Sequence, residues 1–299
     1  MAMTGRQALG WASNELKKAG FSEEAAGRES RLLLSHLWGR TGLNFILNLE
    51  EAVPEALLQR YREWIRLRGT GTPLQYLTGL QDFMGADYQI VPGVLVPRQD
   101  TEILVEAALQ RSDPGESLWA LDLGTGSGAI LGALALRRPG LRGIGIDRNP
   151  IAAALARTNF QRLGLEDRLT VLEGSWFEPL QTTQRSTVEG LPDPPRFDLI
   201  LSNPPYISTA EMEALPADVK QEPESALWGG EDGLDCYRVL IPAARPFLKK
   251  GGWFLAEIGW LQGSAVRAMF LEAGYTDVEI LQDLGQRDRV VCGRIPLLG

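Results

Sequence analysis

Histidine and cysteine are scarce in this 299-residue sequence, and their scarcity excludes several kinds of site. The single histidine, His36, lies in an apolar helical pattern and is expected to be structural rather than a general base. Without a second histidine, neither a serine–histidine triad nor a histidine-rich zinc site is expected. Cys236 and Cys292 have no metal-ligand spacing and form no disulfide framework, so we expect reduced thiols and no bound metal.

The sequence also lacks an excess of positive charge and any long apolar run. Its formal net charge of −8 argues against a general nucleic-acid or membrane-surface binder, although it leaves room for a local basic patch. No apolar run is long enough to span a bilayer, and the N-terminus lacks the apolar core of a signal peptide. We therefore expect a cytoplasmic protein with no membrane partner and no direct nucleic-acid contact.

Residues 1–73 have helical spacing of apolar side chains and no strand signals. A first helix is expected to stop at Gly20, and Ser22 can cap a second one. A third is expected to carry Pro54 in its first turn and Gly69 beyond its end. These features predict a small helical bundle.

The third of these helices carries a run of arginines: Arg60, Arg62, Arg66 and Arg68. Such a run is usually a solvated face. The alternative is a docking surface for a protein or RNA partner, and the sequence leaves both interpretations open.

Residues 69–73 are rich in glycine, threonine and proline, which predicts a linker there. In the predicted domain division, the linker between the two domains comprises residues 74–97. Within the linker, residues 82–90 and 94–96 are expected to pair as a β-hairpin. Its turn would be Val91-Pro92-Gly93.

From residue 98 to residue 299 the pattern predicts one further domain, in which strands alternate with helices from residue 118 onward. Strands are expected at 118–123, 142–147, 169–172, 197–202, 252–257, 278–281 and 289–293. Such alternation implies a parallel sheet covered by helices and built from right-handed crossovers. The predicted fold class is α/β, with a Rossmann-like sheet preceded by the helical bundle and the hairpin linker.

The segment Asp122-Leu123-Gly124-Thr125-Gly126-Ser127-Gly128 joins the first of these strands to a helix, and Asp147 ends the next strand. Glycines let the backbone approach a ligand, and an acidic side chain about 20 residues further on can bind ribose hydroxyls. The spacing also fits a dinucleotide fingerprint, with Ala129 in place of the third glycine. Asp122 would repel the pyrophosphate of a dinucleotide and attract the sulfonium of S-adenosylmethionine. This charge favours S-adenosylmethionine over a dinucleotide as the cofactor. A purely structural glycine turn stays possible.

An apolar strand ending at Ser202 runs into Asn203-Pro204-Pro205-Tyr206. Neither proline can donate to a sheet ladder, so the carbonyls should face a crevice at the strand's carboxyl end. An amide nitrogen is a poor nucleophile because its lone pair is delocalised. The Asn203 oxygen and the Pro204 carbonyl could each accept one N–H of a planar NH₂ group, which would aim that nitrogen at a methyl donor and stabilise its developing charge. Tyr206 would supply a flat packing surface.

These motifs resemble those of the release factor glutamine methyltransferases (the PrmC or HemK family), which are class I S-adenosylmethionine-dependent methyltransferases. The resemblance covers nearly the whole chain and includes further segments: Gly71-Thr72-Pro73, Tyr76, Gly79, Pro97-Arg98, Thr101-Glu102, Trp176-Phe177, Glu222-Pro223, Ala226-Leu227, Gly229-Gly230 and Asp232-Gly233. The Asn-Pro-Pro-Tyr tetrapeptide alone also occurs in DNA adenine and ribosomal RNA guanine methyltransferases. The other segments are what single out the glutamine family.

The resemblance implies a role for each site residue. The cofactor would be held by the glycine loop and by side chains beyond it: Gly124, Thr125, Gly126, Ser127, Gly128, Asp147, Trp176 and Asn203. Asp147 would bind the ribose, and Trp176 would lie against the adenine. The target glutamine would be held by the tetrapeptide Asn203, Pro204, Pro205 and Tyr206. Within it, Asn203, Pro204 and Tyr206 would be catalytic.

The same resemblance gives less specific roles to the segment before the first helix of the second domain. Arg98 and Glu102 would organise the wall between the linker and the active site. Two positions depart from the family's pattern. Gln99 stands where the family usually has a proline, and Ser175 stands before Trp176 where an aspartate is common.

The activity implied by the resemblance is methyl transfer from S-adenosylmethionine to the side-chain amide nitrogen of the glutamine in the Gly-Gly-Gln motif of peptide chain release factors. The by-product would be S-adenosylhomocysteine, the helical bundle would help to hold the substrate protein, and a monomer is expected. One alternative is an N-methyltransferase acting on an exocyclic amino group of DNA or RNA, which would need a basic, base-stacking surface. Another is a nicotinamide dehydrogenase or a non-enzymatic nucleotide-binding module, which leaves Asn-Pro-Pro-Tyr unexplained.

Overall fold

The structure is a computed structural model that describes residues 3–297. The chain forms two compact units. The helical unit contains the residues up to Leu80 together with Pro216–Gln221, and the sheet unit contains Gln81–Leu215 and the residues from Glu222 onward. The short segment Pro216–Gln221 therefore belongs with the helical unit, although its sequence neighbours on both sides belong to the sheet unit. Within residues 3–297, no helix is both long enough and apolar enough to cross a membrane.

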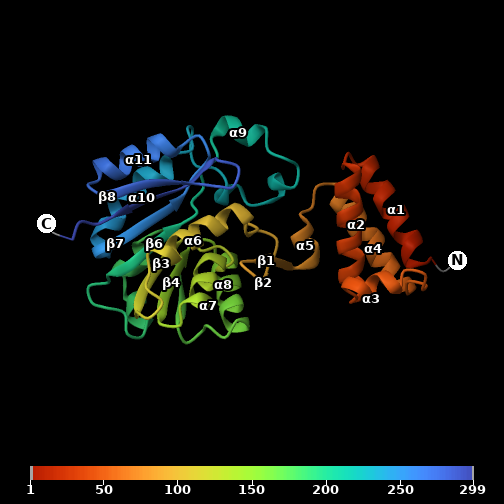
Figure 1. Ribbon diagram of the computed structural model, residues 1–299, viewed down its shortest axis with the longest axis horizontal. Helices are drawn as coiled ribbons and strands as arrows, with labels where there is room; N and C mark the ends of the chain where they lie inside the picture. The colour runs from red at the N-terminus through yellow and green to blue at the C-terminus, as the bar shows by residue number, and fades with distance from the viewer. Residues whose placement is uncertain (1–2, 298–299) are drawn as a thin grey trace. The chain divides into compact units, whose positions relative to one another are not determined.

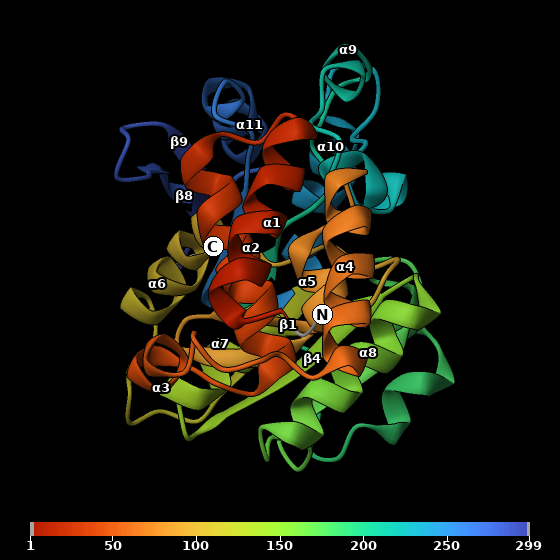
Figure 2. The ribbon, with the colours of Figure 1, turned by 90° about the vertical axis from the view of Figure 1, so that its right-hand side faces the viewer.

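The helical unit confirms the predicted helical region at the N-terminus. Its helices are α1 (Gly5–Lys18), α2 (Glu23–Trp38), α3 (Gly42–Leu47), α4 (Glu55–Gly69) and α5 (Leu74–Thr78). Helices α1, α2 and α4 pack against one another (Figures 1 and 2) around fully buried side chains such as Leu16, Leu33 and Tyr61. Ser22 caps α2 as expected, because its hydroxyl accepts a hydrogen bond from the Ala25 amide. Pro54 is the N-cap of α4 rather than part of its first turn.

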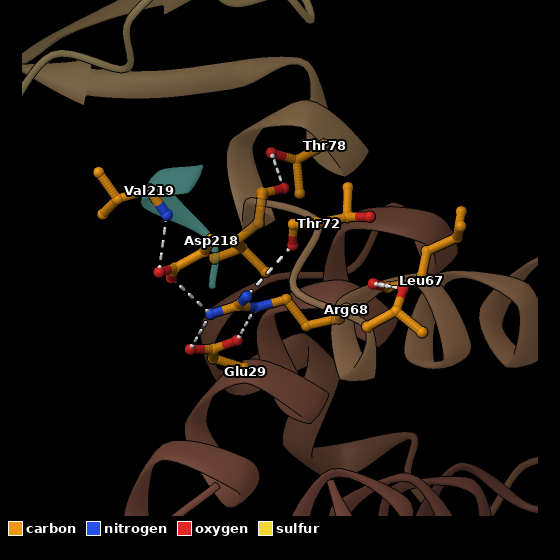
Figure 3. A network of polar contacts seen from close by, with 9 residues as sticks. Glu29, Leu67, Arg68, Thr72, Thr78, Asp218 and Val219 are labelled. Carbon is orange, nitrogen blue, oxygen red and sulfur yellow. Dashed lines mark hydrogen bonds and ion pairs between the residues drawn. The ribbon is translucent and has the colours of Figure 1, made fainter. Parts of the chain in front are cut away.

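One member of the arginine run points into the helical unit instead of into solvent. Arg68 is 7% exposed and forms an ion pair with Glu29, at 2.5 Å between Nε and Oε2 (Figure 3). Its guanidinium also donates to the Thr72 carbonyl and to the Asp218 carboxylate. The interpretation of the run as a solvated face is therefore wrong for Arg68, whose contacts fasten residues 216–221 to this unit.

The sheet unit contains a seven-stranded, mostly parallel sheet in the order β5-β4-β3-β6-β7-β9-β8. Its strands are β3 (Leu118–Leu123), β4 (Leu141–Asp147), β5 (Leu169–Glu173), β6 (Phe197–Ser202), β7 (Leu248–Glu257), β8 (Thr276–Gln282) and β9 (Asp288–Arg294). The first five are parallel, as predicted, while β9 runs antiparallel to both β7 and β8. The exception arises because only a short turn joins β8 to β9, and a parallel pair needs a long crossover.

Helices cover both faces of the sheet (Figure 1). One face packs against α6 (Glu102–Gln110), α7 (Ala129–Arg137) and α8 (Pro150–Arg162), and the other against α10 (Asp235–Ala244) and α11 (Gly263–Glu272). Strand β6 shows how the sequence achieves this, since Leu199 and Leu201 enter the first core and Ile200 enters the second. Shorter helical segments are η1 (Gln99–Thr101), η2 (Glu178–Gln181), η3 (Thr183–Thr187), α9 (Thr209–Glu213), η4 (Val219–Gln221), η5 (Glu224–Ala226) and η6 (Arg245–Phe247).

The β-hairpin exists, but the predicted strands and turn are wrong. The paired strands are β1 (Leu80–Phe83) and β2 (Ala86–Gln89), and residues 94–96 are not a strand. The turn consists of Met84 and Gly85, with φ of 54° and 79°. Tight hairpin turns of this kind need positive φ at both central residues. Methionine rarely adopts positive φ, so the sequence carries no clear signal for this turn.

Strand order reverses beside β3, which pairs with β4 on one side and with β6 on the other. The carboxyl ends of β3 and β6 lie next to each other, with Leu123 opposite Ser202. In open α/β sheets, ligands bind in the crevice outside the carboxyl ends of the strands at such a reversal. The fold thus brings the glycine loop and the Asn-Pro-Pro-Tyr tetrapeptide to one edge.

Candidate functional site

The glycine loop lies between the end of β3 and the start of α7. The amides of Gly124 and Thr125 both donate to the Ile146 carbonyl, at 2.8 and 3.0 Å, which ties the loop to β4. Gly124, Gly126 and Gly128 have φ of 72°, 56° and 80°. Side chains are strained at these angles, so the alternation of glycine with threonine and serine sets the shape of this loop.

Asp147 holds the loop from the end of β4. Its Oδ2 accepts a hydrogen bond from the Gly126 amide at 2.8 Å, and its Oδ1 accepts one from the Asn149 amide at 2.9 Å. Burial raises the pKa of Asp147, and these two hydrogen bonds act in the opposite direction. Each carboxylate oxygen has two lone pairs, so the group keeps acceptor capacity for a ligand.

Asp122 lies under the loop rather than on the surface of the site. It is fully buried, and its Oδ2 accepts a hydrogen bond from the Thr125 hydroxyl at 2.6 Å. Its Oδ1 is buried without a hydrogen-bond partner among the described residues. Burial raises the pKa of Asp122 to about 7. The geometry therefore does not show a direct attraction between Asp122 and a sulfonium. The buried carboxyl instead holds the glycine loop through Thr125.

The Asn-Pro-Pro-Tyr tetrapeptide begins directly after β6, as predicted. The Ser202 hydroxyl donates to the Leu123 carbonyl at 2.8 Å and so links the ends of β6 and β3. Asn203 donates from Nδ2 to the Thr101 hydroxyl oxygen at 3.2 Å. Among residues 3–297, no donor reaches the Asn203 Oδ1 or the Pro204 carbonyl oxygen. Two acceptors are therefore left for a ligand.

A cavity of about 340 Å³ within the sheet unit adjoins the glycine loop, Asp147 and Asn203. Most of the residues predicted for the site line it: Gly124, Thr125, Gly126, Ser127, Asp147, Trp176, Asn203 and Pro205. Gly128, Pro204 and Tyr206 are not among its lining residues. Gly128 starts α7 and packs on Phe160, since a Cβ there would lie 2.7 Å from the Phe160 Cε1 atom.

Tyr206 is half-buried beside the cavity and has a polar contact that its residue type alone did not indicate. Its hydroxyl donates to the Glu257 carboxylate, with 3.4 Å between the two oxygens. Its main-chain carbonyl accepts from the Gln262 side chain at 2.9 Å. Burial raises its pKa well above the usual range of tyrosine. The side chain therefore stays a neutral phenol.

Trp176 and Ser175 both line the cavity after β5. Trp176 has φ of 47°, an uncommon backbone conformation for a side chain of this size. Its ring comes close to the glycine loop, since a Cβ at Gly124 would lie 3.8 Å from the Trp176 Cζ3 atom. The turn thus aims the indole toward the loop.

Arg98 and Glu102 brace the segment that leads into α6. Arg98 forms an ion pair with Glu222, whose side chain is 1% exposed and also accepts from the Val96 amide at 3.0 Å. Glu102 accepts from the Met84 amide at 2.9 Å and so holds the hairpin turn. Gln99 lies in the short helix η1 between them.

Several residues of the site were missed by reasoning from the sequence. Cavity-lining residues also come from the segment after β2, from η5 and from α10: Val94, Leu95, Ser225, Ala226, Cys236 and Val239. Thr101 and Glu257 were missed as well, although both are buried within reach of the tetrapeptide. The only signal for Thr101 was its place in a segment quoted for the resemblance, and Glu257 had none beyond an acidic residue at a strand's end.

Comparison with protein families assigns both parts of the chain. Residues 7–79 match the PrmC N-terminal domain, and residues 115–267 match a methyltransferase domain. Among solved structures, the hMettl16 catalytic domain, crystallised with an RNA hairpin, has a TM-score of 0.54 at 15% identity and covers 81% of this chain and 82% of its own. A methyltransferase from Pyrococcus furiosus has a TM-score of 0.50 at 17% identity, over 71% of this chain and 90% of its own. At such low identity, the two likenesses show the fold alone.

Relatives of higher identity cover nearly the full chain. The release factor glutamine methyltransferase of Moorella thermoacetica is 43% identical over 96% of this chain and 97% of its own length. The enzyme of Geobacter sulfurreducens is 41% identical over 97% of this chain and 96% of its own length. The enzyme of Escherichia coli is 38% identical over 91% of this chain and 94% of its own length. Because these relatives cover the helical unit, the sheet unit and the site alike, the chain belongs to the release factor glutamine methyltransferase family.

Proposed function

We propose that this chain transfers a methyl group from S-adenosylmethionine to the side-chain amide nitrogen of the glutamine in the Gly-Gly-Gln motif of peptide chain release factors. The observation that carries the proposal is a pair of acceptor oxygens, the Asn203 Oδ1 and the Pro204 carbonyl, beside the glycine loop. Neither receives a hydrogen bond from a donor in residues 3–297. The names of relatives at 43% and 38% identity support a release factor as the substrate.

The residues around the cavity suit S-adenosylmethionine. A volume of about 340 Å³ lies within the range of small-molecule sites. We assign the methionine part to the glycine loop: Gly124, Thr125, Gly126, Ser127 and Gly128. Asp147 would accept from the ribose hydroxyls with its remaining lone pairs, Trp176 would pack on the adenine, and Asn203 would lie beside the transferred group.

When bound, this cofactor supplies a methyl group made electrophilic by a positively charged sulfur. The buried Asp122 carboxyl accepts a hydrogen bond from the Thr125 hydroxyl and so helps to set the shape of the loop that would hold this cofactor. Nothing in this assignment needs a metal ion.

Asn203 and Pro204 would act on the amide nitrogen of the substrate. Two acceptors that each receive one N–H hold the amide plane, direct the nitrogen toward the methyl carbon and stabilise the positive charge that develops on it. Pro205 would form part of the wall, and Tyr206 would pack against the substrate or support the turn. No strong base is required, because the methylated nitrogen is acidic enough to release its proton to water.

For the rest of the chain we propose residues 1–73 as the domain that docks the substrate protein, residues 74–97 as a linker and residues 98–299 as the catalytic domain. The match of residues 7–79 to the PrmC N-terminal domain supports the first of these roles. We further propose a cytoplasmic monomer, with no direct nucleic-acid contact and no membrane contact.

The test is to incubate the purified chain with labelled methyl donor and either a release factor or a nucleic acid. We expect label on the peptide that contains the Gly-Gly-Gln glutamine, and none when that glutamine is replaced by alanine. Label on DNA or RNA instead would favour methylation of an exocyclic amino group and contradict the proposal. A thermal melt adds an independent check, because S-adenosylhomocysteine should raise the unfolding temperature while NAD should not.

A further inference from the structure

The side-chain amide of Asn203 can present either its oxygen or its NH₂ group to the cavity, and only the oxygen can accept the N–H of a substrate amide. What decides its orientation is therefore as important as the residue itself. In the structure, Nδ2 donates to the Thr101 hydroxyl at 3.2 Å, and Oδ1 has no donor among residues 3–297. The Thr101 hydroxyl is the contact that distinguishes the two ends of the amide.

Thr101 can hold the NH₂ end only if its own proton is directed elsewhere, because a hydroxyl has one proton to donate. Thr101 is 3% exposed, at the end of η1, so water does not supply the alternative acceptor. Its hydroxyl hydrogen bonds to the side chain of Glu257, the last residue of β7, which is 1% exposed. An ionised carboxylate can only accept, so the order of donation is Asn203 to Thr101 to Glu257.

The Glu257 carboxylate also accepts a hydrogen bond from Tyr206, the last residue of the tetrapeptide. The Tyr206 hydroxyl donates to Glu257 Oε1, and Oε2 is buried without a partner among the described residues. Glu257 does not line the cavity, so it can act on a substrate only through the residues bound to it. Its backbone carbonyl is fixed by the Tyr237 hydroxyl, at 2.8 Å. One buried carboxylate thus receives hydrogen bonds from Thr101, which holds Asn203, and from Tyr206.

We propose that Glu257 and Thr101 are positioning residues for methyl transfer: together they hold the Asn203 amide with its oxygen toward the cavity, ready to accept the N–H of the substrate amide. This inference rests on the proposed function. It adds that the orientation of the acceptor is set by a carboxylate outside the cavity.

The order of hydrogen-bond donation from Asn203 to Thr101 to Glu257 would reverse if Glu257 were protonated. A neutral Glu257 can donate to Thr101, whose hydroxyl can then donate to the amide oxygen of Asn203 and turn the NH₂ end toward the cavity. Burial raises the pKa of Glu257 to about 7; Arg289 from β9 opposes this shift and Asp100 from η1 adds to it. Tyr206 and Tyr237 also face Glu257, and both stay neutral because burial raises their pKa. The rate of methyl transfer should therefore fall as the pH falls through this value.

The first experiment compares Thr101→Val, which keeps the shape and removes the hydroxyl, with Thr101→Ser, which keeps the hydroxyl. We expect Thr101→Val to lower kcat roughly 10- to 100-fold, as expected for misplacement of a reacting group. Affinity for S-adenosylhomocysteine, measured by calorimetry, should change by less than about threefold, since neither variant alters the loop. Thr101→Ser should recover at least about tenfold of the loss. Equal kcat for the two variants would overturn the proposal.

The second experiment measures kcat against pH for the wild-type chain and for Glu257→Gln. The wild type should lose activity below about pH 7 with a one-proton slope, and Glu257→Gln should be slower and lack that acid limb. An unchanged acid limb in Glu257→Gln would overturn the proposal even if Thr101→Val failed to fold. A wild-type chain that labels no release factor would instead contradict the proposed function, which separates the two failures.

Discussion

The Asp147 carboxylate accepts a hydrogen bond from the Gly126 amide at 2.8 Å, so that the last residue of β4 holds the loop that follows β3. Replacing it by alanine removes this bond, the bond to the Asn149 amide and the acceptor that we assign to the ribose. Each hydrogen bond to a charged group is worth about 1.5–3 kcal/mol. We therefore expect Asp147→Ala to weaken S-adenosylhomocysteine binding at least roughly tenfold in calorimetry.

The matched control for this variant is Glu173→Ala. Glu173 ends the neighbouring strand β5 in register with Asp147, but it is exposed and does not line the cavity. Its replacement should leave the affinity unchanged. Equal affinity of the Asp147 variant and the wild-type chain would remove Asp147 from the site.

Replacing Asn203 by alanine should separate binding from turnover. The side chain contributes one of the two oxygen acceptors and contacts Thr101, but it forms no hydrogen bond with the glycine loop. Loss of one group that stabilises developing charge costs about 10²–10³-fold in kcat. We expect a loss of this size for Asn203→Ala in the release-factor assay, with near-normal affinity for S-adenosylhomocysteine. Undiminished turnover would show that this amide does not hold the substrate.

Gly128 and Gly126 offer a comparison between steric and conformational effects in one loop. A Cβ at Gly128 would lie 2.7 Å from the Phe160 Cε1 atom, whereas a Cβ at Gly126 would have no neighbour within 4 Å. Both residues have positive φ, which costs any side chain about 1–2 kcal/mol. Overpacking adds about 1–3 kcal/mol at Gly128 alone. Urea unfolding should therefore rank Gly128→Ala well below Gly126→Ala in stability, and the opposite order would disprove this explanation.

The buried ion pair of Arg68 and Glu29 predicts a large loss of stability in the helical unit. The side chains of this pair are 8% and 10% exposed, so Arg68→Met leaves an unpaired, buried carboxylate at a cost of about 3–5 kcal/mol. The control is Lys18→Met, because Lys18 pairs with Glu15 at 2.7 Å with side chains that are 73% and 39% exposed. Such exposed pairs contribute about 0–1 kcal/mol. Chemical denaturation should show the difference, and the double variant Glu29→Leu with Arg68→Met should regain part of the loss.

Stability should also depend on pH through Asp122. Burial raises the pKa of this carboxyl from 3.8 to about 7, so the folded chain keeps a proton that the unfolded chain has released between these values. The free energy of unfolding then decreases as the pH rises through that window. Asp122→Asn cannot titrate and should lack this contribution.

The measurement is the difference between the wild-type chain and Asp122→Asn in urea unfolding at about pH 5 and about pH 8. The difference cancels the other titrating groups, such as Glu257, whose raised pKa acts in the same sense, and His36, whose lowered pKa acts in the opposite sense. Identical pH slopes in the two proteins would contradict the assignment.

Local signals account for the parts of the structure that the sequence predicted well. Ser22 caps α2 because its hydroxyl accepts from the Ala25 amide, a contact that depends only on residues three apart. Strand β6 ends at Ser202 as expected, because two prolines follow within three residues. The glycine loop could be predicted for the same reason, since its positive φ angles demand glycine.

Features that depend on distant partners could not be predicted in this way. The hairpin turn uses Met84 at positive φ, and its amide is held by Glu102, 18 residues further along the chain. Glu257 meets Tyr206 only because β7 pairs with β6 in the sheet. Arg68 looked like one more exposed arginine of α4, and its burial results from Glu29 and Asp218. In each case the decisive contact joins residues that no short pattern relates.

The short segment Pro216–Gln221 affects how this molecule can be divided. Because it belongs with the helical unit, a cut after Leu80 would separate that unit from one of its own pieces. Arg68 would then lose Asp218, although it would keep Glu29. Exchange of the first 80 residues between two homologous genes would likewise pair one parent's α4 with the other parent's 216–221 segment. The two regions should therefore come from the same parent. A hybrid chain that combines them from different parents should unfold more readily than either parent.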